Sequence, residues 1–166
     1  MRNIEFPFSE GTSLAGLKLS KARVYGVNLP LTEPFTISLG TQTHFKGVYV
    51  ELESVDGMVG YGEGASLPQI TGDTEDSIFF NSLRVLKGLD GRNIESLEDL
   101  DSFMDAALHL NPAAKNAIDT AAHDLVAKEY GQSLSRLLGG APKGLPTSYT
   151  IPMGSVDDAF RHLDAY

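Results

Sequence analysis

The sequence of 166 residues contains no cysteine, and its basic side chains are scarce. Without cysteine, disulfides, thiolate metal sites and cysteine nucleophiles are excluded. The 13 lysines and arginines stand against 22 aspartates and glutamates, which gives a formal charge of -9. Nucleic-acid and anionic-membrane surfaces depend on clustered cations that neutralise phosphate. We therefore expect neither nucleic acid nor membrane among the partners.

Long apolar runs are also missing. No run approaches the roughly 18 residues that a membrane-spanning helix requires. The first 17 residues have no continuous apolar core like that of a signal peptide, and they carry Glu5 and Glu10. These features predict a protein that is neither secreted nor membrane-spanning, with the cytoplasm as its default location.

Several motifs that carry chemistry are absent. The sequence has no GxSxG nucleophile elbow, no GxxxxGK[ST] phosphate loop and no GxGxxG that opens a helix. The four histidines lack the spacing of a zinc site. Asp119 and Asp124 are five positions apart, too far around a helix to share a cation without other ligands. The residues alone therefore give no support to nucleotide binding, to a zinc site or to a cation shared by these two aspartates.

Alternating apolar and polar residues predict three strands in the first half of the chain. These strands cover residues 17–30, 46–55 and 58–63. The middle strand alternates best, since Val48, Val50 and Leu52 share one face. Asp56-Gly57 is a turn dipeptide suited to a tight hairpin. We expect an antiparallel meander of three strands.

Helical periodicity replaces this alternation after Ala65. It predicts helices over residues 77–86, 96–108 and 112–131, followed by a short helical turn at 133–138. Asp73 or Thr74 can cap the first helix, and Gly88 is expected to end it. Residues 147–151 favour a strand, and Ser155 begins a further helix. This last pair is typical of the first unit of a β/α repeat.

The order of elements predicts an α+β fold: a three-stranded antiparallel meander, then a bundle of three to four helices, then one β/α unit. We expect an N-terminal extension at residues 1–17, a main domain at residues 18–143 and the β/α unit at residues 144–166. Residues 141–146 are the expected linker.

Two segments with aromatic, hydroxyl and glycine residues flank the same strands. They are residues 32–45 (TEPFTISLGTQTHF) and residues 60–74 (GYGEGASLPQITGDT). Loops of this length are often functional, and these two could close over a ligand at one edge of the domain. Composition alone equally allows a pair of ordinary connections.

Five segments of the sequence resemble a known family. They are PFTISLG (34–40), VYVELESVDGMVGYGEG (48–64), PQITGDTEDSI (68–78), AAKNAIDTAAHDLVAKEYG (113–131) and LLGG (137–140). With these segments the chain resembles the enolase superfamily in its mandelate racemase and muconate-lactonising branch, and most of all the dipeptide epimerases of the L-Ala-D/L-Glu type. ITGDT is the segment most specific to those epimerases.

The resemblance implies an enolase N-terminal domain, which caps a (β/α) barrel and closes it with two mobile loops that set substrate specificity. The implied reaction is abstraction of a proton α to a carboxylate or carboxamide, with two lysines and a Mg²⁺ that stabilises the enolate. In that family these groups lie on later barrel strands, so the resemblance implies a truncated barrel here. We expect Mg²⁺ in the complete enzyme, none bound by this chain alone, and no catalytic residue within it.

The resemblance also implies substrate-binding residues. Thr150 matches a threonine that touches substrate in dipeptide epimerases, and the two loops place Gly40, Thr41, Ile70 and Thr71 towards the substrate. Some epimerases of alanyl-glutamate have an arginine where Gly40 stands. The resemblance therefore does not imply that the dipeptide substrate has an acidic second residue.

Three functions are compatible with the sequence. The expected one is the specificity-determining portion of a dipeptide epimerase, acting on a dipeptide or another carboxylate together with the missing barrel portion or oligomer partners. The first alternative is a muconate cycloisomerase or an o-succinylbenzoate synthase-like enzyme. The second is a non-catalytic binding module that has lost its barrel.

Overall fold

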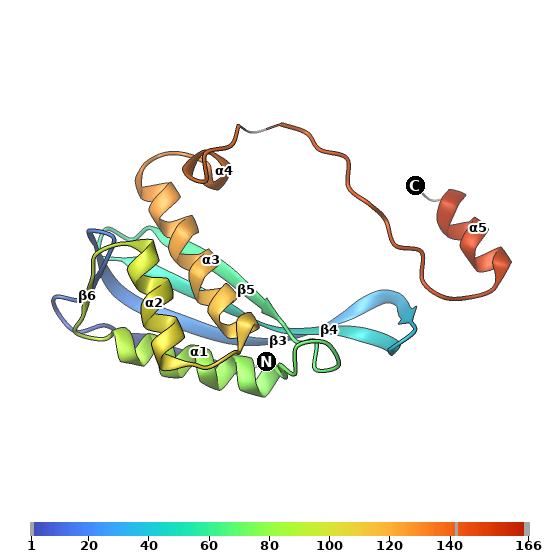
Figure 1. Ribbon diagram of the computed structural model, residues 1–166, viewed down its shortest axis with the longest axis horizontal. Helices are drawn as coiled ribbons and strands as arrows, with labels where there is room; N and C mark the ends of the chain where they lie inside the picture. Colours follow the sequence, from blue (N-terminus) through green and yellow to red (C-terminus); the bar gives the residue numbers. More distant parts are fainter. Residues whose placement is uncertain (1, 142, 165–166) are drawn as a thin grey trace.

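The computed structural model describes residues 2–141 and 143–164 as a sheet covered on one face by helices, with an extended C-terminal segment (Figure 1). The strands are β1 (Arg2–Pro7), β2 (Ser13–Leu14), β3 (Leu17–Ile37), β4 (Gly40–Ser54), β5 (Val59–Ala65) and β6 (Asn93–Ile94). The helices are α1 (Glu75–Leu89), α2 (Leu97–Ala107), α3 (Pro112–Glu129), α4 (Leu134–Leu137) and α5 (Val156–Asp164). The predicted α+β class is confirmed, and β3, β4 and β5 form the predicted antiparallel meander.

Within the expected N-terminal extension, residues 2–7 and 13–14 form strands of the sheet. Strand β1 pairs antiparallel with β3 from Arg2 opposite Gly26 to Pro7 opposite Lys21. Strand β2 pairs with β3 and, in parallel, with β6, which gives the order β5-β4-β3-β2-β6. Strand β1 was not predicted because its side chains are mostly exposed or half-buried, so it lacks a clear apolar face.

The segment 32–45 is a continuation of the sheet, whereas the sequence had suggested a loop. Strands β3 and β4 continue beyond the body of the domain to a tight turn between Ile37 and Gly40. The pairing is interrupted between Pro30 and Phe35, where the register shifts. Proline has no backbone N–H to donate to a strand ladder, so prolines in a segment argue against a paired strand. This is why the sequence predicted a loop here. We call the two-stranded projection of residues 31–45 the arm.

The strand expected at residues 147–151 is not formed. These residues run as an extended segment without regular structure, since no strand of the described chain pairs with them. Helix α5 follows as predicted, and the Ser155 hydroxyl accepts a hydrogen bond from the Asp158 N–H at 3.2 Å. Figure 1 shows α5 beyond the end of the arm, away from the other helices. Residues 165–166 of the expected β/α unit, and Pro142 of the expected linker, lie outside the described residues.

Helices α1 to α3 have the predicted positions with small changes at their ends. Thr74 caps α1 through a capping box with Ser77, and α1 passes through Gly88 to end at Leu89. The core lies between these helices and one face of β3 and β4, where Val24, Val50 and other aliphatic side chains are fully buried. None of the helices in the described part is long and apolar enough to cross a membrane.

The sheet face opposite the helices is charged. Arg23 of β3 binds Glu51 at 2.7 Å and Glu53 at 2.9 Å, both on β4, and also Glu5 on β1. The hydrogen bond from Arg23 lowers the pKa of the Glu5 carboxyl. Cross-strand ion pairs of this kind are typical of a sheet face in contact with solvent. The sheet is therefore antiparallel with one face buried against the helices and the other face solvated.

Helix α3 packs very closely on strand β5. Gly60, Gly62 and Gly64 face the helix, and a Cβ at any of them would overlap the backbone carbonyl of Ala121, Ala117 or Ala113, respectively. At Gly62 the added carbon would also lie only 2.7 Å from the Ala121 nitrogen. The alternating glycines of GYGEG therefore allow the helix backbone to approach the strand.

We predict that Gly62→Ala lowers the free energy of unfolding by about 3 kcal/mol, because the methyl group would force α3 away from β5. The measurement is urea unfolding followed by circular dichroism. Gly144→Ala is the matched control, since nothing lies within 4 Å of its Cβ position. Equal unfolding midpoints for the two variants would contradict this account of the packing.

Candidate functional site

The arm ends in a turn that depends on Gly40. Ile37 pairs with Gly40, whose φ of +136° lies in a region that side-chain-bearing residues rarely adopt. Next to the turn, the hydroxyl oxygens of Thr36 and Thr41 lie 2.9 Å apart and share a hydrogen bond. The turn thus places Gly40 and Thr41 at the far end of the arm.

The second candidate segment, residues 66–73, is a compact loop between β5 and α1. The Ser66 N–H donates to the Lys46 carbonyl at 2.9 Å, which joins the loop to the base of the arm. Inside the loop, the N–H groups of Ile70 and Thr71 both donate to the Leu67 carbonyl, at 2.9 and 3.0 Å. These bonds turn the chain sharply, so Ile70 is held at the surface with 64% of its area exposed.

Asp73 anchors this loop to the core. Its side chain is buried, and one carboxylate oxygen accepts a hydrogen bond at 3.3 Å from the Ala113 N–H in the first turn of α3. Asn111, the residue that precedes α3, makes no side-chain cap hydrogen bond. Asp73 therefore caps α3 from a distant part of the sequence, where the positive end of the helix dipole favours a carboxylate.

Two adjoining hollows lie between the arm and the loop. The one at the turn, which we call the tip hollow, is lined by Ile37, Leu39, Gly40, Thr41, Gln42, Leu67, Gln69 and Ile70. The second, the base hollow, has a volume of about 320 Å³ and is lined by residues 41–46 and 65–69. His44 and Lys46 are the basic side chains of the base hollow.

Three of the five expected substrate residues meet at the tip hollow: Gly40, Thr41 and Ile70. Thr71 lines neither hollow. Its hydroxyl accepts a hydrogen bond from the Asp73 N–H at 3.3 Å, so Thr71 stabilises the conformation of the loop. Leu39 and Leu67 also line this hollow and were not among the expected residues, although a leucine within each polar segment was a usable signal in the sequence.

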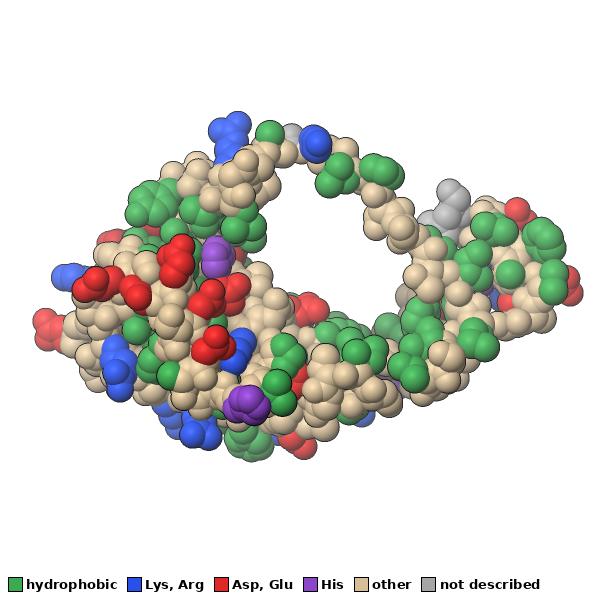
Figure 2. Space-filling view, in the orientation of Figure 1, with side chains coloured by type: hydrophobic (Ala, Val, Ile, Leu, Met, Phe, Trp, Pro, Cys, Tyr) green, Lys and Arg blue, Asp and Glu red, His purple; other side chains and the backbone are tan. Residues whose placement is uncertain are grey.

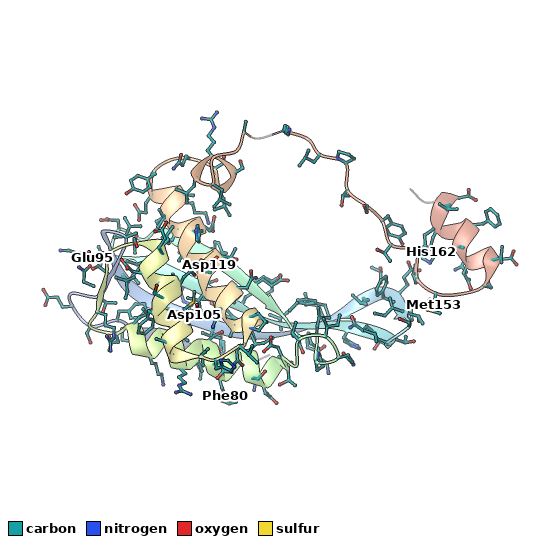
Figure 3. The ribbon with its side chains drawn as sticks, viewed as in Figure 1. Phe80, Glu95, Asp105, Asp119, Met153 and His162 are labelled. Atoms are coloured by element: carbon teal, nitrogen blue, oxygen red, sulfur yellow. The ribbon has the colours of Figure 1, made fainter. Side chains whose placement is uncertain are left out.

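Thr150 lies apart from the two hollows. It is exposed on the extended segment that leads to α5. This segment contacts β3 in the arm, where the Met153 N–H donates a hydrogen bond to the Thr36 carbonyl at 2.7 Å. His162 of α5 joins the same contact, with its Nδ1 at 3.0 Å from the Tyr149 hydroxyl and 3.5 Å from the Glu33 carboxylate (Figure 3). Thr150 lines neither hollow, so the structure does not group it with Gly40 and Thr41.

Within residues 2–141 and 143–164, no three histidine, aspartate or glutamate side chains come close enough together to hold a metal ion. Asp119, which lies on α3 away from the hollows, is half-buried, and this burial raises its carboxyl pKa (Figure 3). Its neighbour is His123, at 3.0 Å, one helical turn along. This pair sits on the α2–α3 surface, so we do not place it in the candidate site.

We predict that Asp73→Ala loosens the loop without unfolding the domain. Leaving the Ala113 N–H unpaired costs on the order of 1–3 kcal/mol, and a local loss of about 1.4 kcal/mol raises amide exchange about tenfold. Hydrogen exchange by mass spectrometry should show this acceleration across residues 66–72. Asp76→Ala, at an exposed carboxylate of α1, is the control and should leave those residues unchanged. Unchanged exchange in Asp73→Ala would show that the anchor is unimportant.

Comparison with known proteins identifies the family. Residues 20–139 match the mandelate racemase / muconate lactonizing enzyme N-terminal domain. The chain is 34% identical over 125 residues to an N-succinyl-L-Arg/Lys racemase of Bacillus cereus, covering 75% of this chain and 34% of the racemase. It is 34% identical over 154 residues to an L-Lys-D/L-Arg epimerase of Desulforapulum autotrophicum, covering 90% of this chain and 43% of the epimerase.

A solved structure shows the same fold. The dipeptide epimerase of Cytophaga hutchinsonii, in complex with Mg and D-Ala-L-Val, superposes with a TM-score of 0.81 at 30% identity, covering 88% of this chain and 40% of that one. The chain thus spans well under half of the length of these relatives. The chain belongs to the N-terminal domain family of the mandelate racemases and muconate lactonizing enzymes, within the enolase superfamily.

Proposed function

We propose that the chain is the capping, substrate-contacting portion of an isomerase of the dipeptide epimerase type. The observation that carries this proposal is the pair of adjoining hollows between the arm and the loop at residues 66–73. Both segments come from the surface of a domain whose relatives include racemases of amino-acid derivatives and epimerases of dipeptides. A capping domain that contacts substrate through two such segments would select which substrate reaches the reacting centre.

The reaction proposed for the whole enzyme is removal and return of the proton on the carbon α to a carboxylate or carboxamide. Such a proton is weakly acidic, so the reaction requires an acid and a base on opposite sides of the substrate and stabilisation of the enolate. The described residues do not gather a metal-binding set. A longer relative was solved in complex with Mg and a dipeptide, and this chain covers only 40% of it. We propose that a barrel supplies Mg²⁺, acid and base, and that this chain positions the substrate and excludes water.

The C-terminal segment supports assembly with such a barrel. On α5, Val156, Phe160 and Leu163 follow the spacing of a single helix face, and each is about three-fifths exposed or more. Figure 2 shows hydrophobic side chains on this helix, which packs against none of α1 to α4. A helix with an apolar stripe gains most of its stability by packing that stripe against another element. We propose that barrel strands cover it, with residues 144–164 as the first β/α unit.

The test is a hybrid enzyme in which residues 2–139 replace the corresponding domain of the Cytophaga hutchinsonii epimerase. We expect the hybrid to incorporate deuterium from D₂O into the α-position of dipeptides in the presence of Mg²⁺, and the barrel without any capping domain to be at least about tenfold slower. NMR of the dipeptide α-proton provides the measurement.

Two further preparations make the result interpretable. A hybrid with Gly62→Ala should lose activity together with its stability, whereas a hybrid with residues 35–42 replaced by Gly and Ser should fold and lose activity alone. A folded hybrid no faster than the bare barrel would contradict a capping role. It would favour the alternative of a binding module that acts without a barrel.

A further inference from the structure

We propose that the tip hollow receives an apolar side chain, so that the substrate is a dipeptide or acylated amino acid with a hydrophobic residue at this position. The inference rests on the proposed function, because it takes the arm and the loop at residues 66–73 to face the substrate. It adds the chemical class of the group that is recognised.

Aliphatic side chains gather at the tip hollow. Ile37 and Leu39 come from the arm, and Leu67 and Ile70 come from the loop, yet all four line one hollow. Leu39 is 55% exposed and Ile70 is 64% exposed, although both lie on polar segments. Single exposed aliphatic residues are common on protein surfaces, whereas four from two separate segments around one hollow form a binding surface for an apolar group.

The lining of the tip hollow carries no charged side chain. The other four residues of the tip hollow are Gly40, Thr41, Gln42 and Gln69, all of them uncharged. An ammonium, guanidinium or carboxylate placed there would lose water without gaining an opposite charge, at a cost of several kcal/mol if fully buried. The amide and hydroxyl groups can bind the peptide backbone of a ligand, while the aliphatic groups bind its side chain.

Gly40 forms the turn at the wall of the tip hollow. With φ at +136°, this residue cannot be exchanged for a side-chain-bearing residue without backbone strain. The wall at that point is therefore bare backbone, and the turn does not provide a charged group of its own. The basic side chains His44 and Lys46 line the neighbouring base hollow, so an acidic ligand group would meet a cation only there.

The experiment measures ligand binding to the 166-residue chain with methyl-labelled isoleucine and leucine. The probes are L-Leu-L-Leu, L-Ala-L-Glu and L-Lys-L-Arg. We expect L-Leu-L-Leu to shift the methyl signals of Ile37, Leu39, Leu67 and Ile70 and to saturate them at about tenfold lower concentration than either charged dipeptide. A tenfold preference corresponds to partial burial of one leucine side chain.

Two variants with the same substitution locate the effect. Ile70→Asp should abolish the preference for L-Leu-L-Leu, whereas Leu145→Asp, at a residue that is 74% exposed on the extended segment, should preserve it. Circular dichroism should show both variants folded, because both side chains lie on the surface.

The inference is overturned if L-Ala-L-Glu or L-Lys-L-Arg binds as well as L-Leu-L-Leu, or if no probe shifts the four residues. Stronger binding of L-Ala-L-Glu would instead assign recognition to the basic side chains of the base hollow. These results differ from failure of the proposed function, which appears as a folded hybrid enzyme that is no faster than the bare barrel.

Discussion

The close contact between α3 and β5 determines the positions of most other parts of the molecule. Two residues of a strand rise about 6.6 Å, and four residues of a helix rise about 6 Å. Successive glycines at 60, 62 and 64 therefore meet successive alanines at 121, 117 and 113, in antiparallel order. The close match of these two periods lets all three contacts form together, and none of the three glycines has room for a Cβ. The consequence is a helix backbone resting directly on the edge strand of the sheet.

Helix α3 also covers the edge of the sheet and anchors the loop of the candidate site. Its polar side chains bind the outer edge of β5: Asp124 accepts from the Tyr61 N–H at 2.9 Å, and Asn116 donates to the Glu63 carbonyl at 2.8 Å. An edge strand covered in this way is not free to pair with another chain. At the other end, the first turn of α3 receives Asp73, so the same helix fixes the loop that forms one wall of the tip hollow.

Sequence periodicity predicted the parts of the fold that bury one face. Strands β4 and β5 and helices α1 to α3 repeat their buried residues every two or every three to four positions, which is the signal that periodicity detects. It failed where pairing comes from other constraints. Strand β1 buries little, and the arm contains Pro34 and follows Pro30. Residues 147–151 pair with no strand among the described residues. For the candidate site, the resemblance to dipeptide epimerases pointed to Gly40, Thr41 and Ile70. The aliphatic residues around them become a group only when the two segments lie side by side, which no local pattern reveals.

The arm connects substrate selection with assembly, because it is held at both of its edges. On the β4 side, the Lys46 carbonyl binds the Ser66 N–H at 2.9 Å, and on the β3 side the Thr36 carbonyl binds the Met153 N–H at 2.7 Å. The register shift after Pro30 leaves the arm with few ladder bonds at its base, so its angle to the sheet depends on these lateral contacts. The width of the tip hollow depends on that angle, since one wall is the arm and the other is the loop. The C-terminal segment reaches the arm through the Met153 N–H and through the contact between His162 and Glu33. The arm therefore lies between the loop that forms the other wall of the tip hollow and the segment that leads to α5.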